Sequence, residues 1–290
     1  MWDNRAAMLD ESQVRDVVRR ALEEDIGGGD LTSRAVVDPG VQAKGVLVAR
    51  EPMVVCGLEI AREAFRQADP GLGFDGAMRD GAWCAPGGVI GTVHGAARPI
   101  LAAERTVLNF LQRLSGIATM TRRMVTLVAG SGVEIADTRK TVPGLRMLDK
   151  YAVATGGGTN HRRGLHDAYL IKDNHWRLAG GVGEAVRRAR AALEGRPAPG
   201  IGIEIEVTSV AEVKEALQAG ADALLLDNMD EPTLAESIAV ARGRAFLEVS
   251  GGLGEERLPR LAALGVQRIS MGALTHSVRA VDIALEVEGA

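Results

Sequence analysis

The sequence predicts an α/β protein in which helices cover parallel strands. Aromatic residues make up only 3% of the 290 residues, whereas glycine occurs 36 times and alanine, valine and leucine are abundant. Such a composition favours helices packed closely on a sheet over an aromatic-rich β sandwich. In addition, a short apolar run that ends in a polar residue, followed by a helical stretch, repeats from about residue 133 onward.

Length, charge and cysteine content narrow the class of protein. With 46% hydrophobic and 25% charged residues, the chain can bury a full core in one large or two modest domains. A formal net charge of -4 argues against a nonspecific nucleic-acid binder. The two cysteines, Cys56 and Cys84, suggest no disulfide framework. The segment after Trp2 lacks the apolar core of a signal peptide, and no apolar run is long enough for a membrane span, so we expect a cytoplasmic protein.

The N-terminal part has the pattern of a separate α+β domain. Val14, Val17 and Leu22 repeat at helical spacing after Asp10, a good N-cap, and the helix is expected to stop at Gly27–Gly29. From about residue 44 to residue 95, short β-rich runs alternate with turn formers. The expected strands are 45–49, 53–56 and 89–93.

A long helix is predicted next, over residues 102–129. Val107, Leu108, Leu111 and Leu114 lie on one face of this helix. We expect Gly116 to interrupt the helix, Gly130 to end it, and the helix to bridge two domains.

The repeated pattern then predicts successive βα units. The apolar runs are 133–137, 168–172, 201–206, 223–227, 246–250 and 266–271, and the ends of the last four lie 21, 23 and 21 residues apart. In a parallel sheet or barrel of such units, the carboxyl ends of all strands share one rim. We therefore expect the polar residues that end these runs to converge, namely Asp137, Lys172, Glu206, Asp227 and Ser250.

A cationic site is predicted between residues 137 and 177. This segment holds eight lysines or arginines against four acids, and three of the five histidines, namely His161, His166 and His175. The basic residues are Arg139, Lys140, Arg146, Lys150, Arg162, Arg163, Lys172 and Arg177. Guanidinium groups match carboxylates and phosphates in two-point contacts, and lysine adds a mobile charge, so the expected ligand is polyanionic.

A phosphate site is predicted after the last two strands. Ser250–Gly252 follows one strand and Gly272–Thr275 follows the next, which is where barrels of this kind often bind a phosphate. Glu206 and Asp227 have carboxylates that could bind ribose hydroxyls or hold Mg²⁺. We favour Glu206 over Glu204, which we expect on the opposite face of its strand.

Several long motifs occur along the chain, namely Gly29–Ser33, Glu104–Thr119, Asp137–Arg146, Gly156–Arg162, Leu170–His175 and Gly272–Ser277. In this order, they are similar to the motifs of quinolinate phosphoribosyltransferases. The chain contains no P-loop, nucleophile elbow, zincin helix or clear dinucleotide fingerprint, which weakens the ATPase, serine hydrolase, zinc protease and dehydrogenase alternatives. The resemblance covers nearly the whole chain.

This resemblance implies a two-domain fold and a homodimer. We expect an N-terminal α/β sandwich domain over residues 1–115, joined by the tail 276–290, and an incomplete, open α/β barrel of parallel strands over residues 116–275. In such a dimer, Arg105 of one subunit would enter the site of its neighbour.

The same resemblance implies a role for each motif residue. Lys140, Lys172, Glu206 and Asp227 would take part in catalysis, with Lys140 binding the phosphoribosyl donor. Glu206 and Asp227 would bind the ribose or its Mg²⁺. The pyridine dicarboxylate would be held by Arg139, His161, Arg162 and Lys172, and Arg105 would bind substrate in the neighbour's site. Further substrate contacts would come from Thr138, Ser250, Gly251, Gly252, Met271, Gly272, Ala273 and His276.

The implied activity is that of a carboxylating nicotinate-nucleotide diphosphorylase. Phosphoribosyl diphosphate and quinolinate would give nicotinate mononucleotide, diphosphate and carbon dioxide for NAD synthesis, with Mg²⁺ and without an organic cofactor. Three alternatives stay open. One is a phosphosugar isomerase or synthase, for which the Arg139, Arg162 and Lys172 cluster would be superfluous. Another is a paralogue with a different substrate, as suspected for molybdenum-associated relatives. The last is a noncatalytic anion-binding protein, which could dispense with Glu206 and Asp227.

Overall fold

The computed structural model describes residues 9–193 and 202–289 in two compact units. We call residues 9–122, 141–157 and 274–289 the sheet unit, and the described residues of 123–140 and 158–273 the barrel unit. The segment around Trp2 and the expected strand start at Ile201 lie outside the described residues. The predicted domain boundaries, 1–115 with 276–290 and 116–275, stay a prediction.

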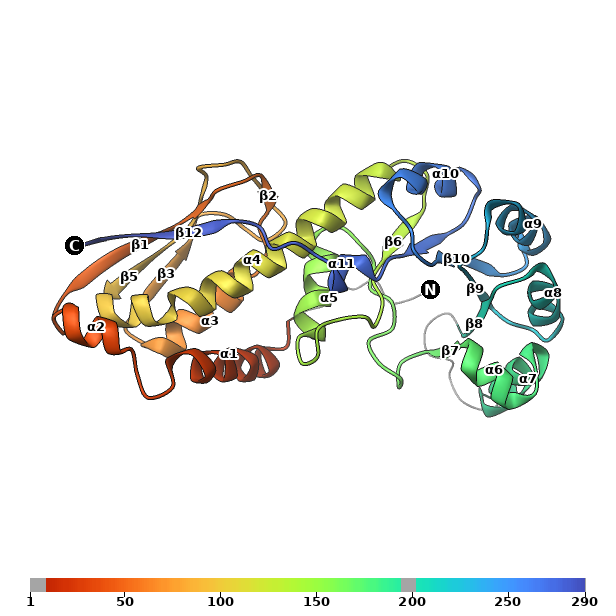
Figure 1. Cartoon of the computed structure of the whole chain (residues 1–290), viewed down its shortest axis with the longest axis horizontal. Helices are drawn as coiled ribbons and strands as arrows, with labels where there is room; N and C mark the ends of the chain where they lie inside the picture. Colours follow the sequence, from red (N-terminus) through yellow and green to blue (C-terminus); the bar gives the residue numbers. More distant parts are fainter. Residues whose placement is uncertain (1–8, 194–201, 290) are drawn as a thin grey trace. The chain divides into compact units, whose positions relative to one another are not determined.

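The sheet unit is built on a four-stranded antiparallel sheet with the order β12-β1-β5-β3 (Figure 1). Its strands are β1 (Gln42–Ala49), β3 (Gly73–Gly76), β5 (Val89–Ala96) and β12 (Ile283–Gly289), and a small second sheet pairs β2 (Met53–Val54) with β4 (Trp83–Cys84). Its helices are α1 (Glu11–Ile26), α2 (Leu31–Val36), α3 (Leu58–Ala68) and α5 (Arg146–Thr155), together with most of α4 (Ala97–Leu127) and α11 (Ala273–His276). The mixed α/β character that we predicted for the N-terminal part is confirmed.

Helix α1 follows its sequence pattern closely. The Asp10 carboxylate accepts hydrogen bonds from the backbone N–H groups of Ser12 and Gln13 at 2.9 and 3.1 Å, which satisfies donors that the first helical turn leaves open. Val14 and Leu22 are buried on one face. The helix ends before Gly27, whose positive φ of 51° suits glycine.

Helix α4 corrects one expectation, because Gly116 does not interrupt it. The helix is continuous from Ala97 to Leu127, starting five residues before the predicted beginning at Ala102. A Cβ atom at Gly116 would overlap the backbone carbonyl oxygen of Arg279. The glycine therefore lets a neighbouring segment approach the helix closely, at a modest loss of helix propensity.

Gly116→Ala is expected to lower the free energy of unfolding by about 1–3 kcal/mol, because the added methyl group forces the Arg279 segment away from α4. Thermal unfolding of the variant checks this. The matched control is Gly40→Ala, since a Cβ atom at Gly40 meets no heavy atom within 4 Å. Equal melting temperatures for the two variants would contradict the close-approach explanation.

The barrel unit is a six-stranded parallel sheet with the order β6-β11-β10-β9-β8-β7. The strands are β6 (Glu134–Ala136), β7 (Tyr169–Ile171), β8 (Ile203–Val207), β9 (Ala223–Asp227), β10 (Phe246–Ser250) and β11 (Arg268–Ser270). Each predicted apolar run overlaps one of these strands; β8 extends one residue beyond the run 201–206, and the runs 223–227 and 246–250 match β9 and β10 at both ends. Within the described residues, the edge strands β6 and β7 do not pair with each other, so the barrel is open, as predicted.

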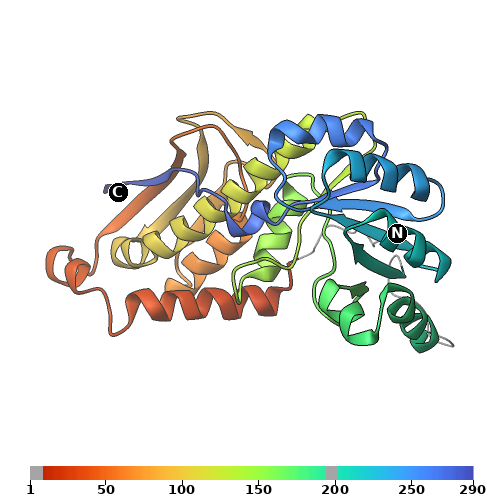
Figure 2. The same ribbon diagram turned by 45° about the vertical axis from the view of Figure 1, so that its right-hand side comes forward.

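Helices follow the strands of the barrel unit and lie outside them (Figures 1 and 2). They are α6 (Asp173–Ala179), α7 (Val182–Leu193), α8 (Val210–Gln218), α9 (Glu231–Ala241), α10 (Leu258–Ala263) and the short 3₁₀ helix η1 (Glu255–Arg257). The strands are mostly buried and combine apolar residues with a few charged ones, and Ile203, Leu224 and Leu247 are fully shielded from solvent. In the described part of the chain, no helix is both long enough and apolar enough to span a membrane.

Candidate active site

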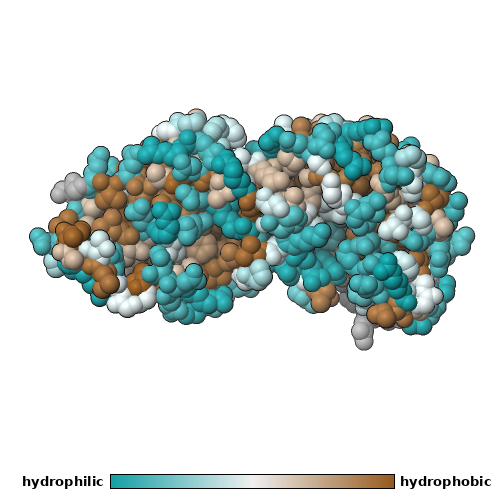
Figure 3. Space-filling view, viewed as in Figure 1, coloured by the Kyte–Doolittle hydropathy of each residue, from teal (hydrophilic) through white to brown (hydrophobic). Residues whose placement is uncertain are grey.

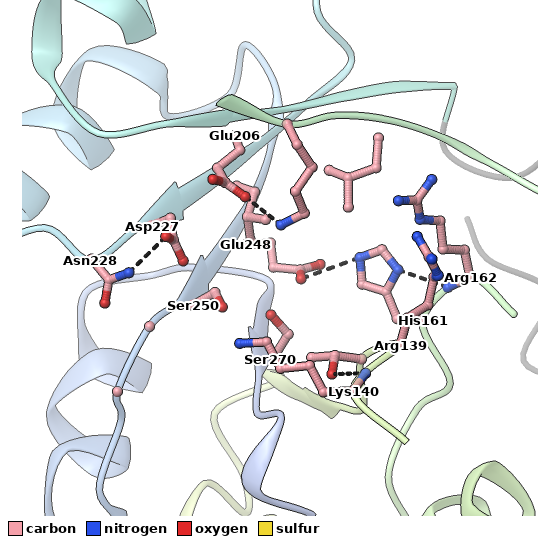
Figure 4. Close-up of a pocket in the computed structure, with 16 residues that line it drawn as sticks. Arg139, Lys140, His161, Arg162, Glu206, Asp227, Asn228, Glu248, Ser250 and Ser270 are labelled. Atoms are coloured by element: carbon pink, nitrogen blue, oxygen red, sulfur yellow. Dashed lines mark hydrogen bonds and ion pairs between the residues drawn. The ribbon is translucent and has the colours of Figure 1, made fainter. Parts of the chain in front are cut away.

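The barrel unit contains a cavity of about 370 Å³ at the carboxyl ends of its strands (Figure 4). Its volume falls within the range of ordinary small-molecule sites. The predicted site residues that line it are Thr138, Arg139, Lys140, His161, Arg162, Lys172, Glu206, Asp227, Ser250, Gly251 and Gly252. The residues that line it without having been predicted are Leu170, Leu225, Asn228, Glu248 and Ser270. Most of the predicted site therefore comes together in one place.

The charges in this cavity are divided between two sides. Figure 4 shows Arg139, Arg162 and His161 on one side, and Glu206 and Asp227 on the other. Arg162 is buried, and burial together with the nearby Arg139 guanidinium lowers its pKa. Two adjacent guanidinium groups with little access to water form a strong subsite for a planar, anionic ligand.

Lys172 lies in the turn between β7 and α6, and its ammonium group pairs with the Glu206 carboxylate at the end of β8. Glu206 is only 8% exposed, whereas the Lys172 side chain is partly accessible. This pair joins the cationic and acidic parts of the cavity. A bound anion would compete with Glu206 for the lysine.

Asp227, at the end of β9, is tied to the glycine loop after β10 by Asn228. The Asn228 side-chain amide donates to Asp227 Oδ2 at 2.8 Å, and its backbone N–H donates to the Ser250 carbonyl at 3.1 Å. Asn228 has a φ of +50°, a conformation that favours glycine and asparagine. A Cβ atom at Gly251 would overlap the Asn228 side chain, so that the loop needs glycine there.

Asn228→Ala is expected to impair turnover more than Asn228→Gly does. Both changes remove the amide that holds Asp227, but only alanine also strains the left-handed backbone beside Ser250, by about 1 kcal/mol. Steady-state kinetics and melting temperatures of both variants measure the two effects separately. A larger defect in Asn228→Gly would show that the backbone conformation is not what matters.

Asp137 does not line the cavity, contrary to our expectation that it converges with the other strand-end residues, and neither do His166 and His175 of the cationic segment. Asp137 is fully buried and accepts hydrogen bonds from Asn160 Nδ2 and from the His161 backbone N–H, at 2.7 and 2.8 Å. It therefore supports the loop that carries His161. His175 accepts a hydrogen bond from the Lys172 backbone N–H at 2.8 Å, and His166 is exposed.

Some predicted residues lie elsewhere. Arg105 is exposed on α4, and His276 is the exposed last residue of α11, both in the sheet unit. Arg146 and Lys150, two basic residues of the cationic segment, also belong to that unit. Met271, Gly272 and Ala273 follow β11 in the barrel unit but are not among the residues that line the cavity.

Our expectation for Glu204 was wrong. Residues two apart on a strand share a face, so Glu204 and Glu206 both face the inside of the barrel unit. Glu204 is 1% exposed, and its carboxylate lies 3.3 Å from His161 Nε2. Glu248 on β10 approaches the same nitrogen at 3.4 Å. The same alternation, counted back from Ser250, would have identified Glu248.

Two family models match this chain along most of its length. The model described as "Quinolinate phosphoribosyl transferase, N-terminal domain" matches residues 30–115, and the model of the C-terminal domain matches residues 117–286. The chain belongs to the quinolinate phosphoribosyltransferase family. The resemblance that we drew from the motifs is thereby confirmed.

Relatives in this family are similar over nearly their full length. A nicotinate-nucleotide pyrophosphorylase (carboxylating) from Mycobacterium leprae is 44% identical over 284 residues, which cover 94% of this chain and 96% of the relative. A probable enzyme of the same name from Bacillus subtilis is 40% identical, covering 96% and 95%. The solved structure of the nicotinate-nucleotide pyrophosphorylase from Francisella tularensis matches with a TM-score of 0.91 at 38% identity, covering 98% of this chain and 99% of that one.

The acidic side of the cavity fits a magnesium ion that is shared with a substrate. Quinolinate phosphoribosyltransferases act on a phosphorylated donor, and Mg²⁺ is usually held by one or two carboxylates together with substrate phosphates. Glu206 and Asp227 end neighbouring strands and line the same cavity. Glu206 is paired with Lys172 and Asp227 with Asn228, so these two carboxylates alone do not form a closed metal cage. The donor set suits a hard cation that arrives with its substrate.

Proposed function

We propose that this chain transfers the phosphoribosyl group of phosphoribosyl diphosphate to quinolinate, with loss of carbon dioxide, to give nicotinate mononucleotide. The observation that carries this proposal is the division of charge in the cavity, with guanidinium groups on one side and carboxylates on the other. Quinolinate has two carboxylates and suits the cationic side, where Arg139, His161, Arg162 and Lys172 would hold it. Membership of the family supports the same reaction.

The acidic side would take the donor. Glu206 and Asp227 would accept hydrogen bonds from the ribose hydroxyls, and the glycine loop Ser250–Gly252 would bind the 5′-phosphate through backbone N–H groups. Lys140 would contact the diphosphate. Glu206 and Asp227 would also hold Mg²⁺, which when bound neutralises part of the diphosphate charge.

The chemistry is mainly a matter of positioning and electrostatics. The bond from the anomeric carbon to diphosphate breaks with oxocarbenium character, and Lys140 stabilises the departing negative charge. The pyridine nitrogen, oriented by the cationic side, then forms the new bond to that carbon. The resulting pyridinium accepts the electron pair that stays on C2 when the 2-carboxylate leaves as carbon dioxide, and a proton then adds to C2.

A homodimer that completes the site is part of the proposal. The sheet unit exposes large apolar side chains, including Leu31 at 80% and Val36 at 74%, and hydrophobic surface is visible over this unit in Figure 3. Exposed apolar groups of this size favour association. Arg105, exposed on α4, would reach the neighbour's cavity. The free cysteines Cys56 and Cys84 suit the reducing cytoplasm, where we place the protein.

The proposed reaction is tested with purified protein, Mg²⁺, phosphoribosyl diphosphate and either quinolinate or nicotinate. We expect nicotinate mononucleotide and an equal amount of carbon dioxide from quinolinate, and no product from nicotinate. Omitting Mg²⁺ is expected to abolish turnover. Preference for another acceptor would mean that the chain is a paralogue with a different substrate on the same fold. Binding without turnover would indicate an anion-binding protein.

A further inference from the structure

A chain of alternating charges crosses the inside of the barrel unit beside the cavity. Glu134 Oε2 lies 2.7 Å from Arg268 Nη2, and Arg268 Nη1 lies 3.4 Å from Glu248 Oε2. The other Glu248 oxygen lies 3.4 Å from His161 Nε2, which in turn lies 3.3 Å from Glu204 Oε2. All of these side chains except that of Glu134 are at least nine-tenths buried. Of the five residues, only His161 and Glu248 line the cavity.

The strand register builds this chain of charges. Arg268 on β11 is the register partner of Glu134 on β6 and of Glu248 on β10, so their side chains lie next to one another. Glu204 reaches the same place from β8, two strands away from β10. His161 lies in a loop that Asp137 supports, because the Asp137 carboxylate accepts a hydrogen bond from the His161 backbone N–H.

Two carboxylates in such a position are costly unless a cation or a hydrogen-bond donor faces each of them. Arg268 faces Glu248, and the pKa of the Glu248 carboxyl is lowered by the nearby His161 and Arg268 in spite of its burial. The imidazole is the cationic or donor group that Glu204 contacts, at 3.3 Å, and Arg268 and Arg162 act on it electrostatically. A proton that His161 directs at these oxygens therefore stabilises the cluster.

The two ring nitrogens of His161 have different surroundings. Nδ1 lies 2.7 Å from the backbone nitrogen of Arg162, whose N–H points at it, whereas Nε2 faces the two carboxylates. Burial alone would lower the pKa of His161, but Glu248 and Glu204 outweigh burial and raise it to about 10. In either charge state of the ring, the carboxylates keep a hydrogen on Nε2. Nε2–H thereby fixes the ring orientation, and in the neutral ring Nδ1 also accepts the Arg162 backbone N–H.

We propose that Glu204 and Glu248 are positioning residues for the acceptor: by holding His161 Nε2–H they fix the imidazole ring and the neighbouring Arg162 in the cationic side of the cavity. Glu204 does not line the cavity and so acts through the histidine, whereas Glu248 both lines the cavity and faces the histidine. This inference rests on the proposed function, because it takes the acceptor to be a pyridine dicarboxylate. It adds two residues that shape the acceptor subsite and were not expected from the motifs.

Glu204→Gln and Glu248→Gln are the test variants, because an amide keeps the volume but can turn an N–H toward Nε2. We expect the KM for quinolinate to rise about tenfold or more, as for one lost member of a buried ion pair, while the KM for phosphoribosyl diphosphate changes less than about threefold. Glu134→Gln is the matched control, since this residue belongs to the same chain of charges but lies far from His161 in it. A purely structural role would raise both KM values together or lower only the melting temperature, and either result would overturn the proposal.

A double-mutant cycle tests whether the carboxylates act through the histidine. In a His161→Gln background, Glu204→Gln is expected to cause no further rise in the KM for quinolinate. A further rise of the full size would show that Glu204 acts independently of His161 and would overturn the proposal. Should Glu248→Gln fail to fold, the Glu204 cycle decides alone.

A nitrogen-15 NMR spectrum of histidine-labelled protein provides a readout that needs no substrate. The chain has five histidines, and His161→Gln assigns the signal of interest. We expect a protonated Nε2 in the unmodified protein and a mixture of tautomers in Glu204→Gln. An unchanged signal, or a stoichiometric divalent metal ion at this cluster, would overturn this inference alone, whereas a failed assay of the unmodified protein would count only against the proposed function.

Discussion

Lys172→Ala is expected to lower kcat/KM for quinolinate at least a hundredfold in a protein that stays folded. The Lys172 ammonium pairs with Glu206 across the middle of the cavity, and its side chain is partly exposed, so no core contact is lost. Removing it withdraws a cation from the acceptor and leaves the nearly buried Glu206 carboxylate without that partner. Truncating one member of such a pair typically costs about 2–5 kcal/mol, which corresponds to the expected decrease in kcat/KM.

The matched control for this variant is Lys214→Ala. Lys214 is an exposed lysine on α8 that does not line the cavity, so kcat/KM should stay within about twofold of the unmodified protein, as for an ordinary surface substitution. Circular dichroism and thermal unfolding show whether both variants are folded. Turnover near that of the unmodified protein in folded Lys172→Ala would remove Lys172 from the site.

Much of the barrel unit could be predicted because its strands are both apolar and regularly spaced. A buried parallel strand reads as a continuous apolar run, and the polar residue that ends it marks the functional rim. Lys172, Glu206, Asp227 and Ser250 were found in this way, and all four line the cavity. Local rules were equally reliable for α1, where the Asp10 cap depends only on neighbouring residues.

Two of the failures depend on contacts distant in the sequence, and a third depends on the position of a residue within its strand. Gly116 looks like a helix interruption until the approach of Arg279 is known. Asp137 fits the pattern of a rim residue, but its carboxylate is taken by the loop at Asn160 and His161. Glu248 lies inside a strand and not at its end, so attention to strand ends alone overlooks it.

The position of Arg105 illustrates a further limit of what the contacts within one chain can reveal. Its motif implies a contact with substrate, and the structure places it on the surface of α4 in the sheet unit. A residue that acts on a neighbouring subunit leaves no trace in the contacts of its own chain. The role of Arg105 therefore needs an experiment that detects sharing between subunits.

Mixing inactive Arg105→Ala and Lys172→Ala proteins is expected to restore activity. If Arg105 enters the neighbour's cavity, each heterodimer combines the intact cavity of the Arg105→Ala subunit with the intact Arg105 of the other subunit. Random exchange at equal concentrations makes half of the dimers heterodimers with one good site of two, so recovery should approach about a quarter of the unmodified activity. Turnover is measured after subunit exchange has been confirmed with two distinguishable tags.

The control mixture is Lys172→Ala with Glu206→Gln. Both residues line the same cavity of one chain, so every site in such a heterodimer lacks one of them and no activity should return. Recovery in this control would mean that the cavity itself is assembled from two chains. No recovery with Arg105→Ala, on confirmed exchange, would place Arg105 in its own subunit's site or outside any site. The pair of mixtures therefore decides between a site completed by a partner and a site contained in one subunit.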